Sequence, residues 1–426
     1  MKILSVWARE ILDSRGNPTV EVDVATENSF ASAAAPSGAS TGKHEAHELR
    51  DGGKRYHGRG VLQAVENVNM AIAPALIGMD ADDQTSIDRK LREVDGTRDK
   101  SNLGANAMVA TSMAVMRAAS ASEGKMVHDR LGGRILPKAM FNIINGGKHA
   151  GGKLAIQEFM IIPEAERFSD RLRMASEIYH VLGKRLTDKY GPWARNVGDE
   201  GGFVPPLDQT SKALDEIMAA IEEAGYAGAC GLAMDAAASS FYENESYTID
   251  GKTLKETQLM EFYADMVKAY PIKSIEDPFH EESFTAFSAL VDALPNVQIV
   301  GDDLVVTNVT RIKQAIDEGA ITALLLKINQ IGTVTEALDA AKLCRENGIK
   351  IVVSHRSGET EDCFIADFAV GIDAGQIKTG APARGERTAK YNQLLRIEER
   401  ILLEERQRLA EEGLAAGMEK VSGGET

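Results

Sequence analysis

Six short apolar runs decide the fold: CGLAMD (230–235), IKSIED (272–277), VQIVGDD (297–303), ALLLKINQ (323–330), KIVVSHRS (350–357) and GQIKTG (375–380). A continuous apolar run is typical of a strand buried on both faces, and helical patterns fill the stretches between the runs. Strands that alternate with helices predict a parallel sheet. With MFNIIN (140–145) and LAIQEFMII (154–162) as two upstream strands, we expect an α/β fold built on an eight-stranded β/α barrel.

In each run a charged or polar residue stands at the point where the apolar part of the run stops. These residues are Asp235, Glu276, Asp302, Lys327, His355 and Lys378, at spacings of 23 to 41 residues, which is about one strand–helix unit each. In a β/α barrel the carboxyl ends of the strands meet at one face and carry the chemistry. We therefore expect these side chains to converge in one site.

The first part of the chain follows another pattern. Residues 3–35 alternate as strands do, and residues 60–121 have helical apolar spacing. This order predicts an α+β domain over residues 1–134, which ends in the Gly- and Pro-containing stretch LGGRILPK (131–138). The barrel domain then takes residues 135–426 and closes with an amphipathic helix after Tyr391, which we expect to pack on the barrel.

The charge balance narrows the range of partners. Lysine and arginine number 48 against 64 aspartates and glutamates, a net charge of −16. Such a surface repels nucleic acid and anionic membranes, and no apolar run approaches the length of a membrane span. The start MKILSVWARE lacks the apolar core of a signal peptide, and the three cysteines form no CxxC pair. We expect a soluble cytoplasmic protein that binds no nucleic acid and spans no membrane.

Asp235, Glu276 and Asp302 end three consecutive runs, so the barrel would bring three carboxylates together. Two carboxylates about 4 Å apart repel by roughly 4 kcal/mol at an effective dielectric of 20. A divalent cation relieves that repulsion, and an all-oxygen ligand set suits Mg²⁺ or Mn²⁺ better than Zn²⁺. The alternative is that each acid is a surface or salt-bridged residue. A single aspartate usually is, but three in register favour a metal site.

Three cationic side chains, Lys327, Arg356 and Lys378, follow at or beside the later strand ends. A lysine inside an apolar run is costly to bury alone. Lys327 is therefore either a counter-charge for the neighbouring acids or a general base whose pKa is lowered by burial and a nearby metal. Arg356 and Ser357 at a strand-to-loop turn suit a phosphate or carboxylate. This arrangement predicts a small anionic substrate between the metal and the basic groups.

Two glycine-bearing loops carry further candidates. NVGDEGGFVPP (196–206) holds Glu200 in a tight loop that can expose a carboxylic acid; the alternative is a bystander acid in a turn that needs positive φ. NIINGGKHAGG (142–152) carries His149, and a lone loop histidine is usually just exposed. Neither loop alone decides between the functional and the structural interpretation.

The chain resembles the enolases in eight motifs, which are DSRGNPTVE (13–21), PSGASTG (36–42), NIINGG (142–147), GDEGG (198–202), SIED (274–277), VGDDL (300–304), SHRSGETED (354–362) and GQIKTG (375–380). The resemblance covers about nine tenths of the chain, and IEDPF (275–279) is more like the archaeal members. It implies a TIM-like barrel with an N-terminal capping domain. It also implies the reversible dehydration of 2-phosphoglycerate to phosphoenolpyruvate in glycolysis and gluconeogenesis, with two Mg²⁺ ions per active site.

The resemblance further implies a role for each candidate residue. Lys327 resembles the base that removes the proton next to the substrate carboxylate, and Glu200 resembles the acid that protonates the departing hydroxyl. The implied metal ligands are Asp235, Glu276 and Asp302 for one Mg²⁺, and Ser40 in a mobile loop for the second. The implied substrate-binding residues are His149, Glu158, His355, Arg356, Ser357 and Lys378.

Other functions and partners stay open at this point. An acid-sugar dehydratase or racemase of the same superfamily typically carries a lysine pair on an earlier strand, and none is visible near Glu200. A non-catalytic relative is expected to lose Lys327, Glu200 or a metal ligand, and all are present. The resemblance alone implies a homo-oligomer, a dimer or higher, and a surface or secreted pool with a second role stays open.

Overall fold

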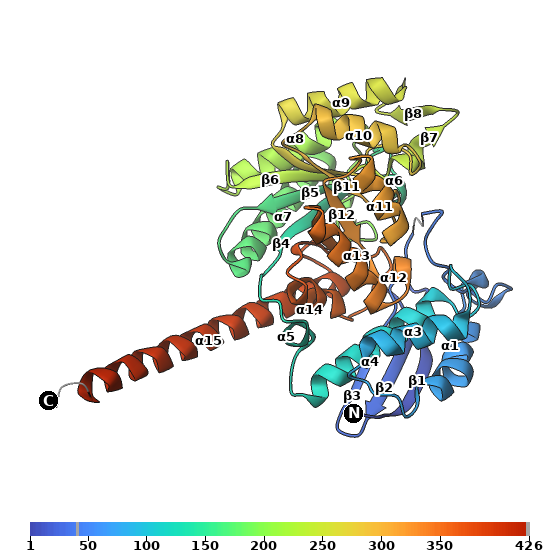
Figure 1. The fold of residues 1–426 in the computed structure, drawn as a ribbon. Coiled ribbons are helices and arrows are strands. Elements are labelled where there is room, and N and C mark those ends of the chain that lie inside the picture. The colour runs from blue at the N-terminus through green and yellow to red at the C-terminus, as the bar shows by residue number, and fades with distance from the viewer. Residues whose placement is uncertain (40–41, 423–426) are drawn as a thin grey trace.

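The computed structural model describes residues 1–39 and 42–422, with side chains described through Glu412 (Figure 1). An N-terminal α+β unit lies against a closed eight-stranded barrel, which confirms the predicted fold class. The predicted metal ligand Ser40 lies outside the described residues. The boundary at residue 134 stays a prediction, and it falls between the last helix of the N-terminal unit and the first barrel strand.

The N-terminal unit is an antiparallel sheet with helices on one face. Its strands, in spatial order, are β1 (Ile3–Leu12), β2 (Pro18–Thr26) and β3 (Phe30–Ala34). The helical segments are η1 (Arg55–Gly58), α1 (Leu62–Asn67), η2 (Val68–Ile72), α2 (Ala73–Leu76), α3 (Gln84–Asp95), α4 (Ala105–Ser122) and α5 (Val127–Leu131). Val20, Val22 and Val24 alternate onto the buried face of β2, and α4 contacts β2 and β3. The opposite face leaves Trp7 59% exposed.

The barrel closes through eight hydrogen-bonded strands. In spatial order they are β10 (Ile272–Glu276), β11 (Gln298–Gly301), β12 (Ala323–Leu326), β13 (Lys350–Ser354), β14 (Gly375–Lys378), β4 (Lys138–Asn145), β5 (Glu158–Pro163) and β6 (Cys230–Asp235). A separate cluster of buried side chains from these strands fills the interior, among them Met140, Met160, Leu325 and Val352. The barrel interior is therefore a packed core, and a ligand site can lie only at the ends of the barrel.

One strand corrects the prediction of a wholly parallel sheet. β5 runs antiparallel to both β4 and β6. The segment between β4 and β5 contains only the four-residue helix α6 (Gly147–Ala150), which is too short to carry the chain back for a parallel crossover. The reversal places Glu158, the first residue of β5, beside Asp235, the last residue of β6. Glu158 thus lies at the catalytic face of the barrel although it begins its strand.

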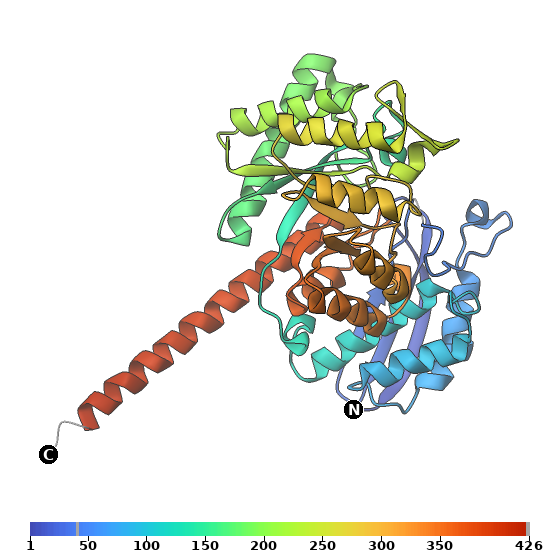
Figure 2. The ribbon, with the colours of Figure 1, turned by 45° about the horizontal axis from the view of Figure 1, so that its top comes forward.

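Helices surround the outside of the barrel (Figure 2). They are α7 (Phe168–Tyr190), η3 (Pro192–Arg195), α8 (Thr210–Glu223), α9 (Glu256–Ala269), α10 (Phe284–Ala293), α11 (Val309–Asp317), α12 (Ile328–Ile331), α13 (Val334–Glu346), α14 (Phe364–Gly371) and α15 (Gly385–Ser422). A small sheet of β7 (Tyr242–Glu243), β8 (Ser246–Ile249) and β9 (Lys252–Leu254) follows the short helix η4 (Ala238–Phe241). Within the described residues, no helix is long and apolar enough to cross a membrane.

The terminal helix α15 has two parts. Its first half packs on the body of the protein through Leu394, Ile397 and Ile401, which are buried as the amphipathic pattern predicts. Its second half extends away from the body, as both views show (Figure 1 and Figure 2). Only the first half of α15 therefore contributes to the barrel side of the fold.

Candidate active site

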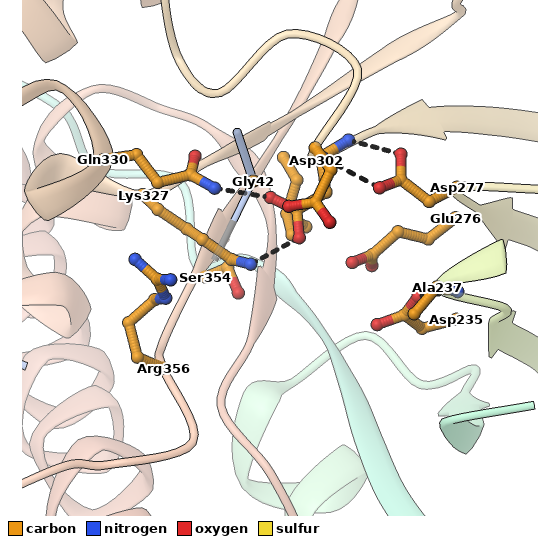
Figure 3. Close-up of polar contacts among 12 residues, drawn as sticks. Gly42, Asp235, Ala237, Glu276, Asp277, Asp302, Lys327, Gln330, Ser354 and Arg356 are labelled. Carbon is orange, nitrogen blue, oxygen red and sulfur yellow. Dashed lines mark hydrogen bonds and ion pairs between the residues drawn. The ribbon is translucent and has the colours of Figure 1, made fainter. Parts of the chain in front are cut away.

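Three carboxylates meet at the carboxyl ends of neighbouring strands. Asp235 ends β6 and Glu276 ends β10, and the two residues are paired in register. Asp302 directly follows β11. All three are buried, which brings them into one low-dielectric region (Figure 3). The sequence prediction that these acids converge agrees with their placement.

Lys378, the last residue of β14, lies among the acids. Its Nζ donates to both oxygens of Glu276 at 2.9 Å and lies 3.3 Å from Glu158 Oε1 and 3.4 Å from Asp235 Oδ2. Burial favours the neutral amine, but the surrounding carboxylates outweigh it and hold the pKa of Lys378 well above its ordinary value. The lysine is therefore a fixed positive charge in the site.

Lys327 follows β12 and donates to Asp302 Oδ2, as the dashed line in Figure 3 marks. Burial lowers the pKa of Lys327, but attraction to Asp302 outweighs burial, so that pKa lies above its ordinary value. The sequence hypothesis of a pKa lowered by burial and a nearby metal stays a prediction, because the attraction of Asp302 acts here without a metal. The contacts of Lys327 fit the counter-charge interpretation. A role as a base requires a neutral amine, and therefore that another cation binds the Asp302 carboxylate.

The acids around Lys378 and Lys327 suit a divalent cation. Burial and the repulsion of Asp235 raise the pKa of Glu276 well above its ordinary value, although Lys378 opposes the shift. Asp277, with φ +40°, accepts the backbone N–H groups of Asp302 and Asp303 and so fixes the turn that presents Asp302. Carboxyl oxygens are hard donors, so the residues present fit Mg²⁺.

The tightest acidic groups differ from the predicted ligand set. Among the described residues, ligand atoms lie within 4.8 Å of one another in two groups, one of His149, Glu158 and Glu200, the other of Asp277, Asp302 and Asp303. Asp235 and Glu276 belong to neither group, and both contact the ammonium of Lys378. Only Asp302 is common to the predicted set and a tight group.

Glu158 and Glu200 form a carboxyl pair beside His149. His149 Nδ1 lies 3.7 Å from Glu158 Oε1 and 3.6 Å from Glu200 Oε1, and Asn142 donates to Glu200 Oε2 at 3.1 Å. Burial and repulsion by Glu200 raise the pKa of Glu158 well above its ordinary value. Burial would also raise the pKa of Glu200, but the two neighbouring histidines and Arg387 hold it well below its ordinary value. The two carboxyl groups therefore titrate as one coupled pair and not as independent acids.

His149 and His355 are both buried, so the interpretation of His149 as an exposed loop residue is wrong. Burial lowers the pKa of His149, and it lowers the pKa of His355 to about 3. His355 Nε2 lies 3.2 Å from Glu200 Oε2. In both cases burial opposes the imidazolium form, whereas the Glu200 carboxylate favours it.

Arg356 and Ser357 follow β13, and both are buried. Arg356 donates to both oxygens of Glu45 at 3.0 Å and to Asn329 at 3.1 Å. Arg15 Nη1 lies 3.5 Å from Ser357 Oγ. The guanidinium of Arg356 thus already holds a carboxylate bidentately, which is the geometry that an anionic substrate group would require.

A cavity of about 20 Å³ lies at the centre of these groups. Its lining includes most of the predicted site residues, namely His149, Glu158, Glu200, Asp235, Lys327, His355, Arg356, Ser357 and Lys378. A larger pocket of about 400 Å³ shares Gly38 and Arg356 with it and is bordered by residues of the 36–48 segment. Buried atoms without a hydrogen-bond partner among the described residues include Glu158 Oε2, Gln157 Oε1 and His149 Nδ1. These atoms can therefore form hydrogen bonds with a bound ligand.

Sequence reasoning missed several residues that hold the site together. Arg15 and Glu45 lie in or next to the quoted motifs DSRGNPTVE and PSGASTG, so the motifs themselves were the available signal. Asn142 opens the quoted motif NIINGG and Gln330 ends the quoted run ALLLKINQ, but a neutral side chain there does not indicate the contact with Glu200 or Asp302. Arg387 lies on α15, far along the chain from the strand ends, and only the structure brings it to His355.

The chain is similar to proteins of one family along nearly its whole length. The family model described as "Enolase, N-terminal domain" matches residues 3–131, and "Enolase, C-terminal TIM barrel domain" matches residues 133–411. A relative named Enolase from Methanosarcina barkeri is 57% identical over 93% of this chain and 94% of its own length. Relatives of the same name from Methanocaldococcus jannaschii and Pyrococcus furiosus are 55% and 56% identical, each over 94% of this chain, and over 96% and 95% of their own lengths.

Proposed function

Because this chain belongs to the enolase family and is a hydro-lyase (EC 4.2.1.11), we propose that it interconverts 2-phosphoglycerate with phosphoenolpyruvate and water, with two Mg²⁺ ions per active site. The observation that carries the proposal is the buried set of three acids and three cationic side chains at one barrel end. The reaction builds a dianionic enolate, which needs concentrated positive charge beside a base. This site has that composition.

Asp235, Glu276 and Asp302 would hold one Mg²⁺, and Ser40 would contribute to the second. The support is the hard oxygen donor set and the raised pKa of Glu276. A divalent cation bound there would act as a Lewis acid that stabilises the charge on the substrate carboxylate. Lys378 would lie beside that carboxylate as a fixed ammonium.

Lys327 is the proposed base. Its Nζ would take the proton from the carbon next to the carboxylate, and the electron pair of that C–H bond would form the enolate. This requires a neutral amine, so the Asp302 carboxylate that now accepts from Lys327 must be occupied by other positive charge. The burial of Lys327 favours the neutral form once that attraction is removed.

Glu200 is the proposed acid, and Glu158 is the proposed reservoir of its proton. As the hydroxyl departs with its bonding electrons, it needs one proton to leave as water. The support is the close approach of the two buried carboxyl groups, in which burial and the charge of Glu200 raise the pKa of Glu158 well above its ordinary value. Neutral His149 beside both carboxyls can relay that proton.

Arg356 and Ser357 are the proposed phosphate ligands, and His355 lines the site. The support is the bidentate grip of Arg356 on the Glu45 carboxylate, which a phosphate would replace or share. The remaining proposed substrate contacts are His149, Glu158 and Lys378. The substrate would bridge the metal-binding acids and the Arg356 side of the cavity.

We also propose that the protein works as a homo-oligomer, a dimer or higher, in the cytoplasm. Oligomerisation is supported by the uncovered face of the N-terminal sheet, where Trp7 is 59% exposed, and by the exposed Phe30 of β3. Light scattering on the eluted protein tests it, since a monomer mass at working concentration would contradict the proposal.

The direct test is the ultraviolet absorbance of the enol phosphate after 2-phosphoglycerate and Mg²⁺ are added to the protein. We expect absorbance to rise and excess EDTA to stop the rise. No rise from folded, metal-loaded protein would contradict the proposed reaction.

Lys327→Ala should lower turnover by about 10²-fold or more, since that is the lower range of what a positioned acid or base supplies. Substrate binding, followed by calorimetry, should persist. A matched control is Lys313→Ala on α11, which no site contact involves. Near-normal turnover of Lys327→Ala would remove Lys327 as the base.

A further inference from the structure

A buried arginine on the terminal helix contacts the histidine next to the proposed acid. Arg387 is fully buried in the first turn of α15, and its Nη1 lies 2.7 Å from His355 Nδ1. The same guanidinium donates to the backbone carbonyls of Arg356, Ser357 and Asp199. These bonds fix its plane against the loop that carries His355.

The chemistry of the two groups decides which imidazole nitrogen carries the proton. A guanidinium has five N–H donors, no acceptor, and stays protonated in proteins. His355 Nδ1 must therefore accept from Arg387 through its lone pair. A neutral imidazole with an unprotonated Nδ1 carries its hydrogen on Nε2.

The geometry points to Arg387 as a positioning residue that locks His355 in the Nε2–H tautomer and so places an N–H, not a lone pair, next to Glu200. His355 Nε2 lies 3.2 Å from Glu200 Oε2, which is ion-pair distance, although the two atoms are not aligned as a hydrogen bond. Asn142 contacts the same oxygen from β4 at 3.1 Å. The Asn142 amide thus hydrogen-bonds the Glu200 carboxylate, and Nε2 of His355 lies next to the same oxygen.

The Nε2–H tautomer of His355 also limits where a proton of the Glu158–Glu200 pair can move. His355 has no free lone pair to accept it, because Nδ1 faces Arg387 and Nε2 is already protonated. The proton of the carboxyl pair is thereby confined to Glu158, Glu200 and the neighbouring His149. That consequence rests on the proposed acid role of Glu200, whereas the tautomer itself rests on geometry alone.

The first test uses the intact protein and does not depend on activity. Nitrogen-15 NMR of histidine-labelled protein at neutral pH distinguishes a protonated from an unprotonated ring nitrogen, and a His355→Asn sample assigns the signal. We expect a lone-pair signal for Nδ1 and an N–H signal for Nε2. An Nδ1–H tautomer or an imidazolium at His355 would overturn the proposal.

Variants then test whether Arg387 is the cause. Arg387→Lys keeps an obligate donor and should keep the tautomer, whereas Arg387→Met removes the donor and should give a mixture. The matched control is Lys390→Met: Lys390 is also fully buried on α15 and bonds Glu359 and Thr360 of the same loop, but no bond joins it to His355. It should lose stability and keep the tautomer.

Kinetics separate positioning from a merely structural role. For Arg387→Met we expect kcat to fall at least about tenfold, part of the roughly 10²–10⁴-fold that acid–base catalysis supplies, with KM changed much less. Arg387→Lys should recover much of kcat. An unchanged tautomer in Arg387→Met, or equal kcat losses in Arg387→Met and Lys390→Met, would overturn the proposal. If Arg387→Met does not fold, wild type and Arg387→Lys still decide it through the tautomer. Inactive wild type with the expected tautomer would instead contradict the proposed function.

Discussion

His355 is a buried neutral base, and this couples the site to the stability of the fold. Burial, reinforced by Arg387, lowers its pKa to about 3, although the Glu200 carboxylate opposes the shift. In the unfolded chain a histidine has a pKa of about 6.5. Between about pH 6.5 and about 3 the unfolded state binds a proton that the folded state does not. The free energy of unfolding therefore falls as pH drops through this window.

His355→Gln should remove this part of the pH dependence. Between pH 7 and pH 5 the wild type should lose about 2 kcal/mol more of its unfolding free energy than the variant does. The reason is that only the wild type has a histidine at position 355, which takes up a proton when the chain unfolds. Urea unfolding at both pH values measures the difference, and exposed His57→Gln is the matched control. Equal losses in wild type and His355→Gln would contradict a neutral buried imidazole.

The sequence pattern predicts individual site residues only up to a physical limit. The strand-end acids and lysines could be predicted, because alternation and burial act along the local sequence. The contact of Glu45 with Arg356 and the raised pKa of Glu158 could not, because they depend on distances between groups far apart in the chain. The same holds for the pKa of Glu276, which burial and Asp235 raise and which the ammonium of Lys378 only partly offsets.

At the scale of elements, the turn after β14 joins the barrel to α15. Gly380 has φ +84°, and a Cβ built there would lie 2.8 Å from both Arg387 Cδ and the Glu200 carbonyl oxygen. Its own carbonyl accepts from Tyr391 and from the Asn142 backbone. The absence of a side chain at Gly380 thus allows the acid loop, β4 and α15 to approach one another.

Gly380→Ala should destabilise the protein by roughly 1–3 kcal/mol from backbone strain alone and lower turnover by displacing Glu200 or Arg387. Thermal unfolding and the absorbance assay measure both effects. Gly385→Ala at the start of α15 is the control, because a Cβ there meets nothing within 4 Å. A Gly380→Ala protein as stable and active as Gly385→Ala would mean that the turn relaxes freely.

The β5 reversal shows why element order was harder to predict than element type. Apolar runs identify buried strands but carry no information on direction. Direction depends on the connection, and residues 146–157 hold only one short helix. Connection length was therefore the signal that could have predicted the antiparallel strand.

At the scale of the whole molecule, one buried acid ties the N-terminal unit to the barrel. Asp88 on α3 accepts from Ser112 of α4 at 2.6 Å and from the backbone and hydroxyl of Thr335 at 2.8 and 2.6 Å. Ser112 in turn accepts from the Val334 backbone at 3.0 Å. The first turn of α13 is thus capped by residues of the other unit, which sequence patterns could not indicate because the partners are more than 220 residues apart.

Asp88→Ala should therefore weaken the joint between the two units. It leaves the buried donors of Thr335 and Ser112 without their acceptor, at a cost of about 1–3 kcal/mol for each unsatisfied group. Asp83→Ala is the control on the same helix: Asp83 is an exposed N-cap that accepts from Ser86, and its loss should cost about 1 kcal/mol. Urea unfolding followed by tryptophan fluorescence, from Trp7 in the N-terminal unit and Trp193 in the barrel unit, reports both units together. If Asp88→Ala lost no more stability than Asp83→Ala, the units would be held by their apolar contacts, and the capping of α13 by Asp88 would add nothing to the joint.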